Sequence, residues 1–387
     1  MLFGAACLAL FRHSETLRVR TMSSKFAPPA ACPTIADAAL WRPHLANEQR
    51  RPSEVLWLDR GECIDPVFLS LIEAQFRGVS RDAIFAYPSP GPLYRKLGVA
   101  LDLDPSALLL TRGSDGAIKA VYEAFIAAGE KVLTTDPTYQ MYGVYAQIFG
   151  ARLVTVPYRM VDGRPHLGAE EIVSAIFRER PKLVGLPNPD NPTGSVFEEQ
   201  ELRAIIEAAG EVGALMLVDE AYHPFYPITA LPWVKEYGHL VVARTFSKGW
   251  GMAGIRLGYI ASTPEVVALL NKSRTMVEAD GVAMALAERM LDFPDEMQAS
   301  VARLREGRTY FASEMKSLGF HTIETAGNFI HVHFGDKREA VEQALKSVAR
   351  FRVFPDTLLQ EFCRFTTSTK PLMKRVVVAI KGAVDRR

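Results

Sequence analysis

Short apolar runs alternate with stretches of helical periodicity from about residue 105 to residue 261. An apolar run of about four to eight residues is typical of a buried strand, and longer segments with apolar residues every three to four positions are typical of helices. Strands separated by helices form a mostly parallel sheet that is covered on both faces. The alternation therefore predicts an α/β fold that binds its ligand beyond the carboxyl ends of the strands. We expect strands at 107–111, 131–135, 152–156, 182–186, 215–219, 240–244 and 257–261.

Helical periodicity fills several of the gaps between these runs. Ser114 or Asp115 is available to cap the first of these helices at its N-terminus. After about residue 265 the alternation ends, and a long helical region at 264–316 precedes a compact tail with both helix and strand patterns. We expect helices around 118–126, at 141–149 and at 198–209.

The length of the chain predicts more than one domain. With 387 residues, it exceeds the size at which a single hydrophobic core usually stops growing. The change of pattern near residue 265 predicts a large domain at 51–265 and a smaller domain at 266–387. Residues 51–80 are a segment that either domain could include. Residues 1–50 are expected to form an N-terminal arm that is partly disordered.

Charge and cysteine content exclude several classes of protein. The formal net charge is +1 and no Lys/Arg-rich block is present, so nucleic acid is not an expected partner. The cysteines form neither a CxxC pair nor a Cys/His spacing suited to zinc, so no metal site is expected. Scattered thiols of this kind indicate reduced cysteines in a cytoplasmic protein. They are Cys7, Cys32, Cys63 and Cys363.

The first eleven residues, Met1 to Phe11, are apolar, yet they predict neither a signal peptide nor a membrane span. No positively charged segment precedes them, and the run is too short to cross a bilayer. We therefore expect no membrane association and no secretion. We favour a start at Met22, which would leave residues 1–21 outside the natural product.

Four polar segments stand at the ends of expected strands. Lys248 offers an amine that can condense with an aldehyde, although a lysine taken alone is usually a solvated surface charge. Asp219 ends an apolar strand, where a carboxylate is costly to bury unless a cation meets it. A Gly-Ser turn at the start of a helix presents free N–H groups to an anion, although it is more often a simple cap. The four segments are Arg112–Asp115, Asn188–Gly194, Asp219–Tyr222 and Thr245–Arg256.

In type, order and spacing, these segments resemble those of the fold-type I pyridoxal-phosphate enzymes. The resemblance is to the class I/II aminotransferases and, among them, to the histidinol-phosphate aminotransferase branch. It runs from Tyr87 to Tyr259 with good motifs and more weakly to the C-terminus. It implies a large domain with a mostly parallel seven-stranded sheet between helices, a smaller α+β domain, and pyridoxal 5'-phosphate as cofactor.

The resemblance assigns the catalytic groups. It implies that Lys248 carries the cofactor as a Schiff base and moves the proton of the substrate. Asp219 would meet the pyridine nitrogen and keep it protonated. Tyr222 and Asn191 would both contact the phenolic oxygen of the ring.

It also assigns the groups that hold the rest of the cofactor. The phosphate would be bound by backbone and side-chain donors, because helix N-termini and guanidinium groups suit an anion. Tyr139 would stack on the ring, and Tyr87 would reach the phosphate of a neighbouring subunit, which implies a homodimer with shared active sites. The phosphate contacts implied are Gly113, Ser114, Asp115, Thr245, Ser247 and Arg256.

The resemblance places substrate contacts in the small domain and fails at one of them. Arg364 would clamp the substrate carboxylate, with Asn328 as a second contact. Where the branch has an arginine for the substrate phosphate, Phe354 occupies the position, and we expect Arg352 to point to the other face of its strand. The early Asn-Glu-Asn segment of the branch is also replaced, by Leu58–Asp65. These departures argue against histidinol phosphate as the substrate.

The implied function is the transfer of an amino group between an amino acid, or a related amine, and a 2-oxo acid through the Schiff base at Lys248. One alternative keeps the cofactor but breaks another bond, as in decarboxylases and C–S lyases that resemble the same branch. A second alternative is a cofactor-sensing regulator. That alternative is disfavoured, because the residues before the main body contain no helix-turn-helix pattern.

Overall fold

The computed structural model describes residues 29–40, 42 and 51–385. The expectations for Met1–Phe11, for Met22 as the start and for Cys7 lie outside these residues, as does most of the expected N-terminal arm. In the described part of that arm, helix α1 (Pro33–Ala36) lies near α6 (Met141–Ile148). Gln147 of α6 donates a hydrogen bond of 3.2 Å to the carboxylate of Asp37.

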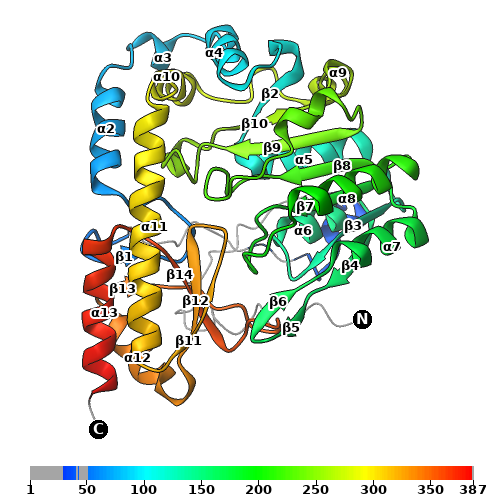
Figure 1. The fold of residues 1–387 in the computed structure, drawn as a ribbon. Helices are drawn as coiled ribbons and strands as arrows, with labels where there is room; N and C mark the ends of the chain where they lie inside the picture. Colours follow the sequence, from blue (N-terminus) through cyan, green and yellow to red (C-terminus); the bar gives the residue numbers. More distant parts are fainter. Residues whose placement is uncertain (1–28, 41, 43–50, 386–387) are drawn as a thin grey trace.

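A seven-stranded sheet forms the centre of the larger body (Figure 1). Its order is β2-β10-β9-β8-β7-β3-β4, and β10 alone runs antiparallel to both of its neighbours. All seven expected strands are present, and the predicted α/β fold with a mostly parallel sheet is confirmed. The strands are β2 (Leu108–Thr111), β3 (Lys131–Asp136), β4 (Arg152–Pro157), β7 (Leu183–Pro187), β8 (Leu215–Asp219), β9 (Leu240–Thr245) and β10 (Gly258–Ala261).

Both faces of this sheet are covered, because successive side chains of each strand enter two different cores. In β8, Met216 and Val218 belong to one core, whereas Leu217 belongs to the other. The second core also holds side chains of three helices: α5 (Gly113–Phe125), α6 and α9 (Pro264–Ser273). The first core is completed by α4 (Gly91–Leu101), α7 (Ala169–Glu179), α8 (Glu199–Glu211) and α10 (Gly281–Met290).

Two local features differ from the expectation. Helix α5 begins at Gly113 after Arg112 and has no side-chain cap, so the capping role predicted for Ser114 or Asp115 is wrong. Both residues lie inside the first turn, where the carboxylate of Asp115 accepts a hydrogen bond of 3.0 Å from the Tyr145 hydroxyl instead. In addition, the hairpin of β5 (Arg159–Val161) and β6 (Arg164–His166) and the following α7 were not anticipated.

The second body is built around a three-stranded antiparallel sheet in the order β11-β12-β14. One side of it packs against α11, the long helix that runs down the left of Figure 1, and against α13. Near them β1 (Leu56–Trp57) pairs in parallel with β13 (Ala349–Arg350), so a segment from early in the chain lies beside the C-terminal segment. The strands and helices are β11 (His321–Glu324), β12 (Phe329–His333), β14 (Phe362–Thr366), α11 (Pro294–Ser317), α12 (Arg338–Leu345) and α13 (Lys370–Val384).

Two further helices, α2 (Pro66–Arg77) and α3 (Asp82–Phe85), connect the early segment to the larger body. Within the described residues, no helix combines the length and the apolar character that crossing a bilayer requires. Three cysteines are described, Cys32, Cys63 and Cys363, and all three are free.

Candidate active site

The expected site residues gather at one edge of the large sheet. Gly258 of β10 pairs with Thr111 at the end of β2 and with Thr245 at the end of β9. Asp219 at the end of β8 pairs in turn with Pro187 at the end of β7. Because these four strands end at the same edge, the segments that follow them lie side by side.

Gly113, Thr245, Ser247 and Arg256 form a cradle of donors at this edge. A Cβ built on Gly113 would lie 3.3 Å from a terminal nitrogen of Arg256 and 3.6 Å from the Thr245 hydroxyl. The hydroxyls of Thr245 and Ser247 are 2.9 Å apart, and Arg256 donates to Ser247 Oγ at 3.4 Å. Gly113 also has a φ of +69°, which favours glycine. The cradle presents hydroxyls, a guanidinium and the N-terminus of α5, and these groups together suit a phosphate.

Asp219 is a buried carboxylate, only 3 % exposed. One of its oxygens accepts a hydrogen bond of 3.0 Å from the backbone N–H of Ala221. Burial raises the pKa of Asp219 to about 7, the charges of Asp115 and Glu220 add to that rise, and Lys248 opposes it. A carboxylate in this setting is stabilised by a cation placed against it.

Lys248 follows β9 and lies half-buried beside these groups. Its Nζ donates to the carbonyl of Arg60 at 2.9 Å and lies 5.4 Å from the centre of the Tyr222 ring. Burial, together with the charges of Arg364 and Arg256, lowers the pKa of Lys248 to about 8. At pH 7 about a tenth of this amine is therefore neutral and able to act as a nucleophile, far more than for a lysine with the ordinary pKa.

Tyr222, Tyr139 and Asn191 complete the group around Asp219 and Lys248. Tyr222 is buried, and burial raises the pKa of its hydroxyl. Tyr139 stands half-buried just before α6, where burial and the nearby carboxylates of Asp115 and Asp219 raise its pKa. Asn191 accepts a hydrogen bond of 2.7 Å at Oδ1 from Arg364. The structure thus brings these three side chains to the same site.

Arg364 and Asn328 reach this site from the small sheet. Arg364 is buried and donates to Asn191 and, at 2.7 Å, to the carbonyl of Asp59. The Nδ2 of Asn328 donates to the carbonyl of Gly61 at 3.0 Å. Asn328 Oδ1 and Arg364 Nε are buried and have no hydrogen-bond partner among the described residues. A buried donor and a buried acceptor are therefore left for a ligand.

The predicted orientation of Arg352 is wrong. Arg352 and Arg364 lie directly opposite each other in an antiparallel bridge, with backbone hydrogen bonds of 3.0 and 2.7 Å. Side chains of directly opposed residues share a face, so Arg352 faces the site. Phe354 lies two positions further on, and alternation places it on the same face as Arg352. The two guanidinium groups lie 5.4 Å (Arg352) and 5.0 Å (Arg364) from the centre of the Phe354 ring.

Gly61 is a site residue that sequence analysis did not identify. A Cβ built on it would lie 2.8 Å from Lys248 Nζ, 3.3 Å from the Tyr222 hydroxyl and 3.6 Å from Asn328 Oδ1. Its φ is +70°, and its N–H donates to the Thr366 hydroxyl at 2.9 Å. Residues 59–61 therefore line the site. They belong to the segment Leu58–Asp65, which was singled out only because it departs from the branch pattern.

Tyr87 is the one predicted site residue that lies apart from the others. It follows α3 and is 94 % exposed. In a single chain it has no part in the group around Lys248.

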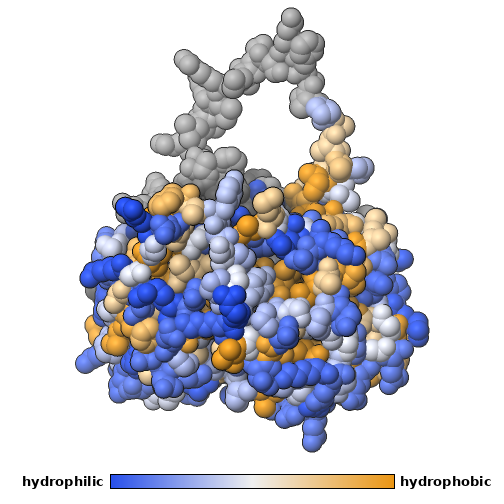
Figure 2. All heavy atoms as spheres, turned by 90° about the horizontal axis from the view of Figure 1, so that it is seen from above, coloured by the Kyte–Doolittle hydropathy of each residue, from blue (hydrophilic) through white to orange (hydrophobic). Residues whose placement is uncertain are grey.

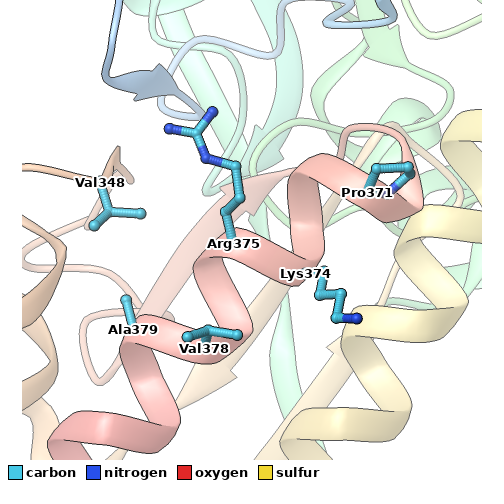
Figure 3. A pocket seen from close by; sticks show the side chains of 6 residues that line it. All are labelled: Val348, Pro371, Lys374, Arg375, Val378 and Ala379. Carbon is cyan, nitrogen blue, oxygen red and sulfur yellow. The ribbon is translucent and has the colours of Figure 1, made fainter.

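A surface groove with a cavity volume of about 490 Å³ lies elsewhere, along α13 (Figure 3). It is open, and none of the predicted site residues lines it, so we do not assign it to catalysis. Among the described residues no cluster of His, Cys, Asp or Glu is arranged to hold a metal ion. The residues that line the groove are Val348, Pro371, Lys374, Arg375, Val378 and Ala379.

The groups at the sheet edge fit pyridoxal phosphate. At Gly113 a Cβ would crowd the guanidinium of Arg256, and the cradle offers donors to a phosphate. Asp219, with its raised pKa, suits a protonated ring nitrogen, and the amine of Lys248 suits an aldehyde. Each of the three functional parts of the cofactor therefore has a complementary group in this chain.

Comparison with known proteins agrees with this geometry. Residues 91–380 match the family model described as aminotransferase class I and II. A histidinol-phosphate aminotransferase of Clostridium novyi is 29% identical over 324 residues, which are 83% of this chain and 87% of that protein. Histidinol-phosphate aminotransferase 1 of Burkholderia lata is 32% identical over 337 residues, 84% of this chain and 92% of that protein.

A solved structure is similar as well. The crystal structure of histidinol-phosphate aminotransferase from Sinorhizobium meliloti in complex with pyridoxal-5'-phosphate superposes with a TM-score of 0.74 and 26% identity. The match covers 85% of this chain and 90% of that one.

Fold and site together define a pyridoxal-phosphate-dependent enzyme of fold type I. The chain belongs to the class I and II aminotransferase family, in the branch that resembles the histidinol-phosphate aminotransferases. It transfers amino groups between small molecules with pyridoxal phosphate as cofactor.

Proposed function

We propose that the amino donor of this aminotransferase carries an anionic group at a distance from its amine, and that Arg352 binds that group. The observation that supports the proposal is the bridge that sets Arg352 opposite Arg364 on the face of the site. Burial lowers the pKa of Arg364 to about 10, and the nearby charge of Arg352 adds to that fall. Burial raises the pKa of the Tyr222 hydroxyl, and the charge of Arg352 opposes that rise. Two guanidinium groups at one site favour a ligand with negative charge.

This arrangement removes one argument against a phosphate-bearing donor. Histidinol phosphate was disfavoured because Phe354 stands where the branch has its arginine for the substrate phosphate, and because Arg352 was expected to point away. Because Arg352 faces the site, a phosphate monoester of an amino alcohol becomes the leading donor class. Histidinol phosphate, the substrate in the names of the relatives, belongs to that class.

We assign roles to the residues of this chain as follows. When bound, pyridoxal phosphate supplies an aldehyde that captures amines and a ring that accepts electrons. Asp219 holds a proton at the ring nitrogen, and the neutral amine of Lys248 takes the proton from the carbon that bears the amino group of the donor. Tyr222 and Asn191 bind the ring oxygen, and Arg364 with Arg352 orients the donor.

The phosphate contacts follow from the cradle. Thr245, Ser247 and Arg256 donate to the phosphate from β9 and the segment after it, and the first turn of α5 adds backbone donors from Gly113, Ser114 and Asp115. Tyr139, which precedes α6, would stack on the ring.

A half-reaction tests this proposal. Purified protein loaded with cofactor is mixed with one donor at a time and without an acceptor, with Lys248→Ala as the blank. We expect histidinol phosphate to bleach the absorption of the bound cofactor and histidinol to do so at least ten times less efficiently, because one charge-assisted contact is lost. Equal rates for the two donors would contradict the proposed role of Arg352.

The Arg352→Gln variant sharpens the same test. We expect KM to rise about tenfold for phosphate-bearing donors and to stay unchanged for uncharged ones. Release of carbon dioxide or of a thiol, without bleaching by any amine, would favour the decarboxylase or C–S lyase alternative.

We further propose that the protein is a homodimer with shared active sites. Large apolar side chains are exposed around α3 in the single chain, at 78 % for Ile84 and 70 % for Phe85, and Tyr87 is next to them. Figure 2 looks down on the end of the molecule where α3 lies and shows apolar side chains among polar ones at this surface. Exposed apolar clusters of this kind mark contact surfaces.

Mixing two damaged chains tests the shared site. In a heterodimer of a Tyr87→Ala chain and a Lys248→Ala chain, one site keeps both native residues and the other keeps neither. We expect the mixture to exceed the mean activity of the two variants. Activity equal to that mean would contradict a shared site.

We place the protein in the cytoplasm. Support comes from its free cysteines, because Cys63 and Cys363 are buried and unpaired, which suits a reducing compartment. Fractionation of the native host with an antibody against the protein is the test, and recovery from an oxidising compartment would contradict the assignment.

A further inference from the structure

His331 is a fully buried histidine that has no role in the proposed chemistry. It lies on β12 directly opposite Arg364 on β14. Because directly opposed residues of an antiparallel pair project to the same face, both side chains leave the small sheet in the same direction. That direction is toward the loop 188–194, which follows β7 of the large sheet.

His331 and Arg364 contact consecutive residues of this loop. Arg364 donates to Asn191 Oδ1 at 2.7 Å, and His331 Nε2 lies 2.8 Å from the carbonyl oxygen of Pro192. A carbonyl can only accept, so Nε2 carries the proton and donates, and Nδ1 is left without one. The small sheet therefore holds the loop at two adjacent points.

The surroundings of His331 keep it neutral and oriented. Burial and the charge of Arg364 lower the pKa of His331 to about 3, so near neutral pH the ring is neutral and Nδ1 carries no proton. The ring centroids of Phe329, Phe354 and Phe362 lie 5.7, 6.3 and 6.4 Å from that of His331. These contacts restrict the orientation of the imidazole.

Packing alone does not account for a histidine at this position. Its Nδ1 is buried and has no hydrogen-bond partner among the described residues, which is unfavourable. An apolar side chain would fill the same aromatic surroundings without that cost. The bond from Nε2 to the loop is the contact that an apolar residue could not make.

We propose that His331 is a positioning residue. By donating from Nε2 to the Pro192 carbonyl, it holds the loop so that Asn191 meets Arg364 on one side and the ring oxygen of the cofactor on the other. Only the contact between Asn191 and the ring oxygen of the cofactor rests on the proposed roles of the site residues. The hold of the small sheet on the loop stands independently of them.

Two variants that differ in reach test the positioning role. The amide of Gln at position 331 extends about as far as Nε2 of histidine, whereas the amide of Asn ends near Nδ1. We expect hydrogen exchange in the segment 190–195 to be about five- to tenfold faster in His331→Asn than in the native full-length chain, as the loss of one buried hydrogen bond would cause. In His331→Gln the exchange should stay close to native.

His333→Asn is the matched control, because His333 lies on the same strand and has no bond to the loop. If His331→Asn is not recovered folded, His331→Phe keeps an aromatic ring and lacks the donor, and it replaces the Asn variant. Native exchange rates in the segment 190–195 of His331→Asn, or of His331→Phe where that variant replaces it, would overturn the proposal.

A second readout tests the effect on Asn191. With cofactor bound, the pH midpoint of its absorption change should rise in His331→Asn and stay near the native value in His331→Gln, because a hydrogen bond to the ring oxygen favours one protonation state. Faster hydrogen exchange in the segment 190–195 together with a native pH midpoint would overturn the proposed effect of His331 on Asn191. A native protein with no cofactor absorption would instead refute the proposed site roles, and the exchange experiment would still decide whether His331 positions the loop.

Discussion

The edge of the large sheet and the face of the small sheet build one site by different means. Asp219 and Lys248 stand at or within three residues of a strand end, and the parallel strands bring them together. Arg364, Asn328 and Arg352 come from separate segments, and their orientation depends on the pairing of β12, β14 and the bridge at Arg352. The first set is specified by local sequence, and the second by strand register.

This difference predicts different consequences of substitution. In the proposed roles, the side chains at the sheet edge meet the reacting part of the cofactor, so changes there should affect the chemical step. On the small sheet they meet the donor, so changes there should affect binding. Substitutions on the two sides of the site can test that division.

Asp219→Asn is expected to lower kcat about 10²- to 10³-fold, because the ring nitrogen loses its negative partner. Its thermal stability should not fall, since the variant no longer buries a charge. Asp190 is the matched buried carboxylate, and it accepts hydrogen bonds from the N–H and hydroxyl of Thr193 and from Thr138. Asp190→Asn should lower Tm and leave kcat less affected. Steady-state kinetics and thermal unfolding of both variants test this prediction. Equal losses of kcat in Asp219→Asn and Asp190→Asn would contradict a special role of Asp219 in the chemical step.

Modification of Lys248 should follow its lowered pKa. Because the neutral amine is the reactive form, labelling by an amine reagent should rise with pH and level off above about 8, the pKa of Lys248 in the folded chain, instead of above 10.5. At pH 8 the neutral fraction is about 100-fold larger than for a lysine with the ordinary value. Mass spectrometry of the cofactor-free protein measures the labelling, with the exposed Lys374 as reference. A rise of Lys248 labelling that continued to pH 10 would contradict the prediction.

Arg364→Lys and Arg256→Lys make the same chemical change on the two sides of the site. Arg364→Lys should raise KM for the donor about 30-fold through the loss of a forked contact, with the affinity for cofactor unchanged. Arg256→Lys should weaken the binding of cofactor and change KM for the donor less. Titration with cofactor measures the affinity, and initial rates measure KM. Weaker cofactor binding in Arg364→Lys, or a larger rise of donor KM in Arg256→Lys, would contradict the proposed roles of the two arginines.

Gly61→Ala should reduce kcat/KM about tenfold, because the new methyl group would approach Lys248 Nζ and Tyr222. Gly129→Ala provides the control. Gly129 also has a positive φ, of +88°, but nothing lies within 4 Å of a Cβ built there. Both variants should lose stability through backbone strain. Among the folded proteins, only Gly61→Ala should show a lowered kcat/KM. Similar activities would show that Gly61 does not limit the space at the site.

The large sheet was predictable from sequence because its strands are short apolar runs and its site residues follow them directly. The hairpin after β4 escaped notice although Asp162-Gly163, with φ of +48° and +72°, is a dipeptide typical of tight hairpin turns. Its strands have only three residues each and are mostly exposed, so no apolar pattern accompanied the turn.

The small-sheet contacts could not be predicted in the same way. The direction of the Arg352 side chain depends on its pairing with Arg364. A loop separates the two residues, so this pairing could not be predicted from the sequence. Gly61 and His331 act through backbone contacts with residues more than 100 positions away. A glycine and a histidine outside any motif give no local signal of such contacts.

We propose that Lys248 holds the cofactor covalently at the edge of the large sheet, close to Asp219. Reduction of the cofactor-loaded protein with borohydride, followed by proteolysis and mass spectrometry, tests it directly. We expect one modified peptide, with the pyridoxyl group on Lys248. A pyridoxyl group on another lysine, or a protein that binds the cofactor and yields no modified lysine, would contradict it.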